Sequence, residues 1–227
     1  MTFTMNLVGI DESSKQILEH VEPYEHIIWD WNGTLLNDAH IAVEVVGELL
    51  EEHGLPSIDL TQYRDLFGFP VKDSYEVLGF DFSEISFEEL SDRFMDRYHQ
   101  RSKDHAQPFL GIEAILKSIA ENKQQSILSA AAQWHLDELT RHFSLHHHFH
   151  NIYGLSDHYA HSKVERGREL VAGSTVPREK TILIGDTDHD WHVAEAVGID
   201  VLLIADGHQS YERLIAAHSN VLASRFK

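Results

Sequence analysis

The chain has 227 residues, of which 42% are hydrophobic, and its formal net charge is −19. This length allows one α/β domain with an inserted subdomain, and the acidic balance argues against nucleic-acid binding, which usually needs a basic face. There is no cysteine, which excludes disulfides, thiolate catalysis and cysteine-ligated zinc, and no apolar run approaches the length of a membrane span. We therefore expect a cytoplasmic protein that binds neither nucleic acid nor a membrane.

The first 25 residues precede any pattern typical of a strand. A short amphipathic helix is predicted between Ser13, a residue type that often caps helices, and Pro23, a residue type that ends them. Its expected inward-facing side chains are Ile17, Leu18 and Val21. A helix packed on the outside of the core is the simpler interpretation and a dimerisation arm is the alternative, so we expect a monomer or a homodimer.

Residues 26–30 (His-Ile-Ile-Trp-Asp) form a short apolar run that ends in an acid. This pattern predicts a buried parallel strand that delivers the carboxylate of Asp30 to its C-terminal edge, where open α/β sheets bind their ligands. Asn32 and Gly33 then turn the chain, and Thr34 adds a hydroxyl beside the acid. Taken alone, Asp30 is more simply interpreted as a strand-end residue that only caps a turn.

The next segment has a helical pattern and no strand. Apolar residues recur at helical spacing as far as Gly54 and Pro56, which end the first helix. A helix is predicted over 60–67, before Gly68-Phe69-Pro70 breaks it, and a long amphipathic helix over 87–103. The inward side of the long helix is expected to carry Leu90, Phe94, Met95 and Tyr98.

After residue 108 the pattern alternates between helix and strand. Strands are predicted over 125–129, 181–184 and 201–204, and helices over 112–121, 134–143, 164–171 and 191–197. This alternation favours an α/β fold with a Rossmann-like parallel sheet and right-handed crossovers. The histidine-rich stretch at 146–150 is expected to be a solvated loop, with a transition-metal site as the alternative.

A second acidic motif follows the strand at 181–184. Asp186 and Asp190 are four residues apart, which is about one helical turn, and Mg²⁺ prefers hard oxygen ligands of this kind. With Asp30 they supply three carboxylates for a metal site. Asp188 and His189, which lie inside the motif, are expected to be solvated turn residues.

Together these motifs resemble the haloacid dehalogenase superfamily, most of whose members are Mg²⁺-dependent phosphatases. The sequence Asp-x-Asn-Gly-Thr-Leu-Leu at 30–36 is similar to the first motif, and Ser129, Lys163 and the stretch 185–190 follow in the order and with the gaps of the others. The resemblance covers about residues 27–205. An all-helical insertion after the first motif resembles the cap of the first subclass, which implies a core of residues 1–37 and 108–227 and a helical cap domain over 38–107.

The resemblance implies a role for each motif residue. Asp30 would be the nucleophile that forms an aspartyl-phosphate, Ser129 would hydrogen-bond the transferring phosphoryl group, and Lys163 would neutralise charge. Thr34 is counted among the substrate-binding residues. The implied Mg²⁺ ligands are Asp30, Asp186, Asp190 and the backbone carbonyl of Asn32, and the implied substrate is a small phosphorylated metabolite.

The predicted cap contains a stretch, Arg64 to Lys72, that resembles the specificity segment of phosphoglycolate-phosphatase-like enzymes. Arg64 and Lys72 are therefore predicted to bind an anionic part of the substrate, because cationic groups in an otherwise acidic protein attract anions. Two charged residues on a solvated helix face are the alternative.

Asn32 departs from the phosphatase pattern, which has a second aspartate at this position as the general acid and base. An amide forms hydrogen bonds but does not exchange a proton at neutral pH, and such proton transfer typically contributes about 10²- to 10⁴-fold. The substrate could have a good leaving group, as acyl and aryl phosphates do. Otherwise another residue, such as His161 or a cap side chain, carries the proton, or the reaction does not need it.

Three other interpretations stay open. Phosphonoacetaldehyde hydrolase has Asp-Trp-Ala-Gly-Thr in this motif and cleaves a C–P bond through a cap lysine, for which Lys72 is the candidate, although its spacing is one residue off. The dehalogenase branch also lacks the second aspartate, but it needs no metal, whereas Asp186 and Asp190 favour one. The third interpretation is a catalytically silent protein that binds a phosphorylated ligand.

Overall fold

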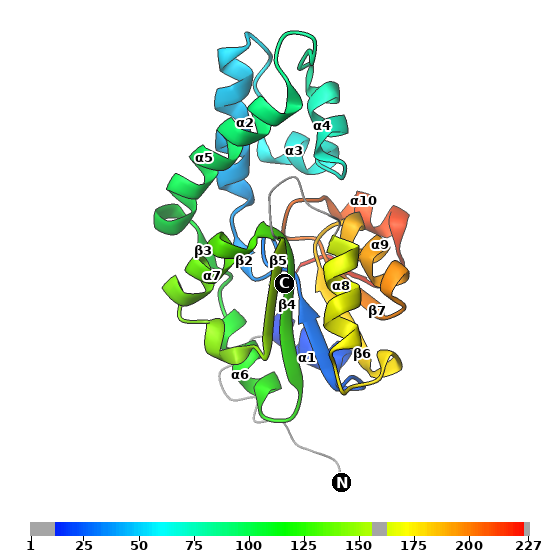
Figure 1. Ribbon diagram of the computed structural model, residues 1–227. Coiled ribbons are helices and arrows are strands. Elements are labelled where there is room, and N and C mark those ends of the chain that lie inside the picture. The colour runs from blue at the N-terminus through cyan, green and yellow to red at the C-terminus, as the bar shows by residue number, and fades with distance from the viewer. Residues whose placement is uncertain (1–11, 156–162, 225–227) are drawn as a thin grey trace.

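The computed structural model describes residues 12–155 and 163–224, and within them a six-stranded parallel sheet forms the centre (Figure 1). The strands run in the order β5-β4-β1-β6-β7-β8. Their bounds are β1 (His26–Trp29), β4 (Gln124–Ala132), β5 (Asn151–Leu155), β6 (Thr181–Gly185), β7 (Asp200–Ile204) and β8 (Val221–Leu222). This confirms the predicted α/β fold with its parallel sheet, although β5 and β8 were not among the predicted strands.

The alternation of side chains in β1 divides the core into two layers. Ile27 and Trp29 pack in one buried cluster with α1 (Glu12–Val21), α6 (Ile112–Ala120) and α7 (Gln133–His142). Ile28 faces the opposite cluster, which is formed with α8 (Lys163–Ala172), α9 (Asp188–Val197) and α10 (Tyr211–Ala217). Because successive strand residues point to opposite faces, helices cover both sides of the sheet. Two short 3₁₀ helices, η1 (His146–His148) and η2 (Arg178–Lys180), join these elements.

The strand register brings two acids to one edge of the sheet. Trp29 pairs with Ile127 of β4 and with Ile184 of β6, and the amide of Asp30 donates to the carbonyl of Ile184 at 2.8 Å. The chain therefore leaves β1 and β6 side by side, so that Asp30 and Asp186 follow neighbouring central strands. This is the arrangement that the two apolar strands with acidic ends predict.

A helical unit, defined here as residues 39–105, stands above this edge of the sheet (Figure 1). It consists of α2 (Ala39–Glu52), α3 (Leu60–Leu66), α4 (Val71–Leu78) and α5 (Phe87–His105). The short strands β2 (Leu36–Asn37) and β3 (Gln107–Pro108) pair antiparallel where the chain enters and leaves it. The division into a core and a cap at 37/38 and 107/108 stays a prediction. Within residues 12–155 and 163–224, no helix combines the length and the hydrophobicity that a membrane crossing requires.

Candidate active site

Three buried aspartates meet at the edge of the sheet. Asp30 is 6% exposed, and Asp186 and Asp190 are fully buried. One carboxylate oxygen from each lies within 4.8 Å of the others. Asp30 follows β1, Asp186 follows β6, and Asp190 belongs to the first turn of α9. The structure thus brings together the three carboxylates that the sequence suggested as metal ligands.

Lys163, the first residue of α8, is the cation of this cluster. Its Nζ atom lies 2.5 Å from Asp30 Oδ1 and 2.5 Å from Asp190 Oδ1, and its side chain is 3% exposed. One ammonium group therefore faces three carboxylates. Because like charges at such distances repel strongly in a buried site, the cluster favours a further positive charge.

The pKa values of the three aspartates reflect this excess of negative charge. Burial raises the pKa of Asp30 well above its usual range, with Asp190 and Asp186 adding to the effect and Lys163 opposing it. Burial also raises the pKa of Asp186. For Asp190, burial is outweighed by Lys163 and Thr187, which hold its pKa below the usual value. Three clustered carboxylate oxygens are the donor set that a hard divalent cation prefers, so the residues fit Mg²⁺.

Asp186 is held by two donors and two close glycines. Thr34 Oγ1 donates to Oδ1 at 2.7 Å, and the amide of His208 donates to Oδ2 at 2.7 Å. A Cβ atom at Gly33 would lie 2.2 Å from Asp186 Oδ2, and one at Gly207 would lie 2.1 Å from it. Thr34 was predicted to bind substrate, but it is fully buried and does not line the pocket described below, so its observed contact is with Asp186.

Asp190 caps its own helix as well as pairing with Lys163. Its Oδ2 atom accepts from the amide and the hydroxyl of Thr187, at 3.0 and 2.7 Å. This capping box starts α9 at Asp188, three residues earlier than predicted. Asp188 and His189 are therefore half-buried residues of a helical first turn. The expectation that they are solvated turn residues was wrong, because it overlooked the threonine that caps the helix.

Ser129 lies inside β4, although the prediction ended the strand at this residue. The pairing of β4 with β5 shifts register between Leu128 and Ala132, and Ser129 Oγ accepts from the amide of Ala131 at 3.1 Å. The side chain is 1% exposed and lines the pocket. The strand thus continues through a local irregularity past Ser129, whose small polar side chain faces the pocket.

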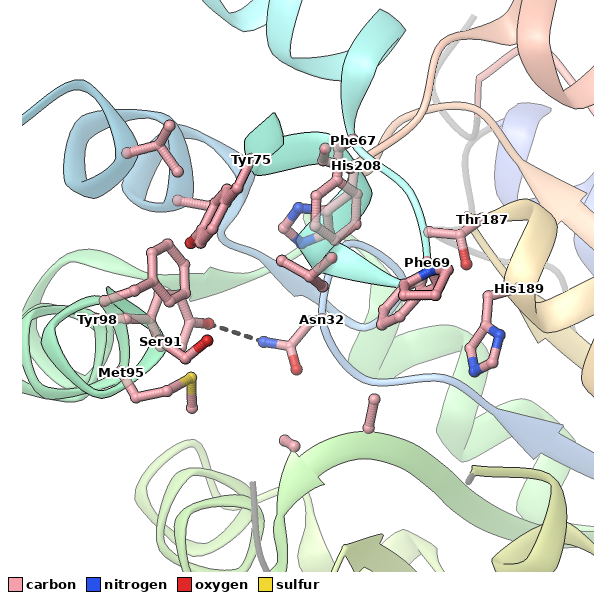
Figure 2. Close-up of a pocket in the computed structure, with 18 of the residues that line it drawn as sticks. Asn32, Phe67, Phe69, Tyr75, Ser91, Met95, Tyr98, Thr187, His189 and His208 are labelled. Carbon is pink, nitrogen blue, oxygen red and sulfur yellow. Dashed lines mark hydrogen bonds between the residues drawn. The ribbon is translucent and has the colours of Figure 1, made fainter. Parts of the chain in front are cut away.

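Asn32 belongs to a buried polar network that the sequence did not suggest. Its Nδ2 atom donates to Asp38 Oδ2 at 2.9 Å and to the Tyr98 hydroxyl at 2.7 Å (Figure 2). The Tyr98 hydroxyl in turn donates to Asp38 Oδ2 at 2.6 Å. Asp38 directly precedes α2, yet its side chain makes no capping bond to that helix. Its carboxylate faces the site instead, and Asn32 provides one of its donors.

His208, in the loop after β7, completes this network. Its Nε2 atom lies 3.4 Å from Asp38 Oδ1, and Nδ1 lies 2.9 Å from the Tyr63 hydroxyl. Burial lowers the pKa of His208, but Asp38 outweighs burial and, with Asp186 and Asp30, raises it to about 9. The rule that ligands bind at the carboxyl ends of parallel strands could have directed attention to this loop.

A pocket of about 430 Å³ opens between the sheet edge and the helical unit. Asp30, Asn32, Ser129 and Lys163 lie at its polar end. Aromatic and aliphatic side chains of the helical unit, among them Tyr75, Met95 and Tyr98, form most of its walls (Figure 2). The four residues predicted to be catalytic therefore all line the pocket. His161, another candidate proton carrier, lies outside the described residues.

Arg64 and Lys72, predicted to bind substrate, do not line this pocket. Arg64 donates from Nε to the carbonyl of Gly207 at 2.8 Å and from Nη2 to that of Asp206 at 2.7 Å. Lys72 is exposed, and its Nζ atom lies 5.1 Å from the centre of the Phe82 ring. Arg64 is occupied by backbone carbonyls and Lys72 is exposed, and a role in substrate binding for either residue stays a prediction.

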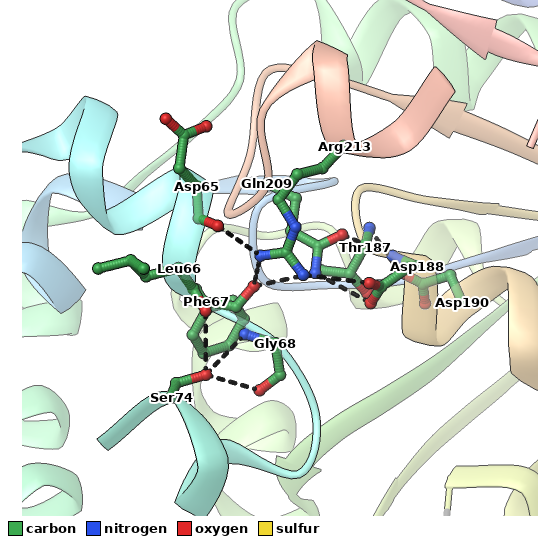
Figure 3. A network of polar contacts seen from close by, with 10 residues as sticks. All are labelled: Asp65, Leu66, Phe67, Gly68, Ser74, Thr187, Asp188, Asp190, Gln209 and Arg213. Carbon is green, nitrogen blue, oxygen red and sulfur yellow. Dashed lines mark hydrogen bonds and ion pairs between the residues drawn. The ribbon is translucent and has the colours of Figure 1, made fainter. Parts of the chain in front are cut away.

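The contact between the helical unit and the loop after β7 is polar (Figure 3). The carbonyl of Phe67 accepts from Gln209 Nε2 at 3.0 Å and from Arg213 Nη1. The amide of Ser210 donates to the carbonyl of Arg64 at 3.3 Å. Together with the two bonds from the Arg64 side chain, these contacts fasten the helical unit to the edge of the sheet.

We expect Arg64→Met to lower the free energy of unfolding by about 1–3 kcal/mol, because two half-buried carbonyls lose a charged donor. Urea unfolding measures this change. The matched control is Arg93→Met on α5, whose ion pairs with Glu89 and Glu52 are exposed and should contribute less than about 1 kcal/mol. Equal losses in the two variants would contradict a fastening role for Arg64.

The histidine-rich stretch holds no comparable cluster. Among the described residues, the acidic trio is the one group of histidine and acidic side chains with the geometry to hold a metal. His146 to His148 form η1, and His146, His147 and His150 are exposed. The alternative of a transition-metal site in this stretch therefore has no geometric support.

Comparison with known proteins gives consistent matches. The family model described as haloacid dehalogenase-like hydrolase matches residues 27–204. Tyrosine-protein kinase PtkA from Mycobacterium tuberculosis is 26% identical over 184 residues, which cover 80% of this chain and 62% of the kinase. Phosphoglycolate phosphatase from Xanthomonas campestris is 32% identical over 98 residues, which cover 42% of this chain and 43% of that enzyme. The chain thus spans less than two thirds of the length of either relative.

Among solved structures, a haloacid dehalogenase-like hydrolase from Streptococcus pneumoniae has a TM-score of 0.75 at 24% identity. The superposition covers 88% of this chain and 93% of that one. At this level of identity the likeness concerns the fold alone.

Proposed function

Because the chain belongs to the haloacid dehalogenase-like hydrolase family, we propose that it is a Mg²⁺-dependent phosphatase that acts on a small phosphorylated substrate through an aspartyl-phosphate. The family match confirms the resemblance on which this expectation was based. The observation that carries the proposal is Asp30 at the polar end of a pocket, 2.5 Å from Lys163 and clustered with two more carboxylates. Relatives named as phosphatases support the same activity.

In the proposed reaction, a carboxylate oxygen of Asp30 attacks phosphorus, and the bond from phosphorus to the ester oxygen breaks with its electron pair leaving on that oxygen. Water then attacks the phosphorus of the aspartyl-phosphate, which releases phosphate and restores the carboxylate. Lys163 neutralises charge beside the nucleophile, and the Ser129 hydroxyl donates to the phosphoryl group. Mg²⁺, held by Asp30, Asp186, Asp190 and the carbonyl of Asn32, would stabilise the negative charge of the transferred group.

Two alternative functions were C–P bond hydrolysis and phospho-ligand binding without turnover. C–P bond cleavage through Lys72 gains no support, because that lysine is exposed and does not line the pocket. A silent ligand-binding protein differs from a phosphatase only in turnover, so a rate measurement distinguishes the two.

The test is phosphate release from p-nitrophenyl phosphate with Mg²⁺ and with EDTA. We expect turnover in Mg²⁺ only, because the leaving group needs no proton while the crowded carboxylates need a cation. Asp186→Asn should raise the Mg²⁺ concentration for half-maximal activity by at least about tenfold, since even residues that only orient metal ligands are worth about 10- to 100-fold in affinity.

The matched control is Asp188→Asn, which removes a nearby carboxylate that contacts Gln209 and Arg213 rather than the cluster. It should leave the Mg²⁺ titration unchanged. An unchanged titration for Asp186→Asn would mean that the metal binds elsewhere. Phosphate binding without any turnover would favour the silent protein.

A further inference from the structure

The pocket walls contain no charge on the side of the helical unit. Every side chain that residues 39–105 contribute to the lining is neutral, and most are apolar or aromatic. Its aromatic members include Phe67, Phe69, Tyr75, Phe94 and Tyr98, and Met95 adds a thioether. Burying an apolar group of a substrate against such a wall contributes favourably to the free energy of binding, whereas burying an unpaired charge there is unfavourable.

The charged groups at the polar end are already paired with each other. Among the described lining residues, Lys163 pairs with Asp30, and His208 pairs with Asp38. Burial lowers the pKa of His135 to about 4, so this ring is neutral at pH 7, and the ring of His189 stacks on Phe69. Once the phosphoryl group has engaged Lys163, the described lining offers no further lysine or arginine to a second anionic group of the substrate.

The aromatic side chains stand on two sides of Asn32. Figure 2 shows Tyr98 and Met95 on one side, and Phe69 and His189 on the other. Phe69 stacks on His189 with ring centres 4.5 Å apart, and Phe94 stacks on Tyr98 at 5.8 Å. A ring between these groups would meet aromatic faces and edges, which attract another aromatic ring beyond simple burial. About 430 Å³ is ample, since a cavity of roughly 150 Å³ holds benzene.

The chemistry at Asn32 favours the same kind of substrate. The amide cannot give a proton to a departing oxygen, and the Tyr98 hydroxyl beside it already donates to Asp38. Without a proton from either group, we expect the leaving group to depart as an anion. A phenol has a pKa of about 10, far below that of an aliphatic alcohol, so a phenolate leaves much more readily than an alkoxide.

From these two observations together we infer that the substrate is an aryl phosphate monoester whose aromatic group carries no second anion. This inference rests on the proposed phosphatase activity and names its substrate class. Asp30 attacks phosphorus, the bond from phosphorus to the aryl oxygen breaks, and the phenolate takes its proton from solvent. The aryl group belongs either to a free small molecule or to a phosphotyrosyl side chain, which share this chemistry.

The first experiment compares kcat/KM for phenyl phosphate, 4-carboxyphenyl phosphate, phosphoglycolate and acetyl phosphate. Phenyl phosphate should exceed phosphoglycolate by at least about 10³-fold, combining the missing proton donor with the apolar wall. The para carboxylate should lower kcat/KM at least tenfold although it improves the leaving group, which isolates the effect of the wall. A phosphotyrosyl peptide assayed beside free phosphotyrosine and phenyl phosphate distinguishes the two sources.

A variant tests the wall directly. Met95→Lys introduces a cation on a half-buried position of α5, and Met95→Gln is the neutral control. The lysine should raise the ratio of kcat/KM for 4-carboxyphenyl phosphate over phenyl phosphate by about tenfold, and glutamine should not. Equal rates for phenyl phosphate and phosphoglycolate, or for the two aryl esters, would overturn the inference while leaving a phosphatase. No turnover of any of the four compounds, including acetyl phosphate, would instead overturn the proposed function.

Discussion

Replacing Asp30 by asparagine is expected to lower kcat for aryl and acyl phosphates by at least about 10⁴-fold, because an amide cannot act as the attacking nucleophile. The fold should survive. The amide oxygen of the new residue can still accept from Lys163, and the substitution removes one of three carboxylates that repel each other in the cluster. The free energy of unfolding should therefore equal or exceed that of the parent.

Two measurements check this result. Single-turnover kinetics with a radiolabelled aryl phosphate reports the chemical step, and urea unfolding reports stability. The control is Asp200→Asn, which makes the same chemical change at the surface. There the Asp200 carboxylate accepts from the Tyr24 hydroxyl. Activity of Asp30→Asn within about tenfold of the parent would show that another group attacks phosphorus.

Asn32→Asp is expected to raise the turnover of alkyl phosphates by about 10²-fold, because it restores a carboxyl group that can protonate a departing alkoxide. Aryl and acyl phosphates should change much less, since their leaving groups depart without a proton. The structure adds a cost, because the new carboxylate would face Asp38 where Asn32 Nδ2 now donates at 2.9 Å. We expect the free energy of unfolding to fall by about 1–3 kcal/mol at pH 7.

A double variant separates the two effects. Combining Asn32→Asp with Asp38→Asn exchanges donor and acceptor across the same contact, so part of the lost stability should return while the gain with alkyl phosphates remains. The pair between Asp38 and His208 is not restored. Because Asn32-Gly33 is a dipeptide prone to deamidation, intact-mass and peptide analysis of the parent must precede the kinetics. Equal alkyl phosphate turnover in the pure parent and in Asn32→Asp would mean that another residue carries the proton.

The acidic cluster was predictable because few alternatives exist for its parts. A short apolar run ending in an acid is typical of a strand that delivers a carboxylate, and two such parallel strands release their acids at the same edge. The two motifs together therefore predicted that Asp30 and Asp186 lie close to each other, although Asp30 alone did not. The exact start of α9 was missed because Thr187 was not recognised as its cap.

The direction of side chains in the helical unit was not predictable in the same way. Arg64 looked like an anion-binding residue, but its direction depends on how α3 sits against the loop after β7, a contact between residues more than 140 positions apart. One partner of Asn32 is likewise distant, since Tyr98 comes from α5. β5 was missed because Asn151 and Gly154 interrupt its apolar pattern. Gly154 is needed there, as a Cβ atom would lie 2.8 Å from the carbonyl of Ala131.

The polar contact that fastens the helical unit to the loop after β7 limits how this protein could be re-engineered. The walls of the pocket come mostly from one continuous insertion, residues 39–105, whereas the groups that handle charge come mainly from the edge of the sheet. Exchanging that insertion with one from a relative is therefore a natural route to a new specificity. The exchange would succeed only if residues 206–213 travelled with it, because their carbonyls and side chains are matched to Arg64 and Phe67 of this chain. The interchangeable module is thus two segments of sequence, not one.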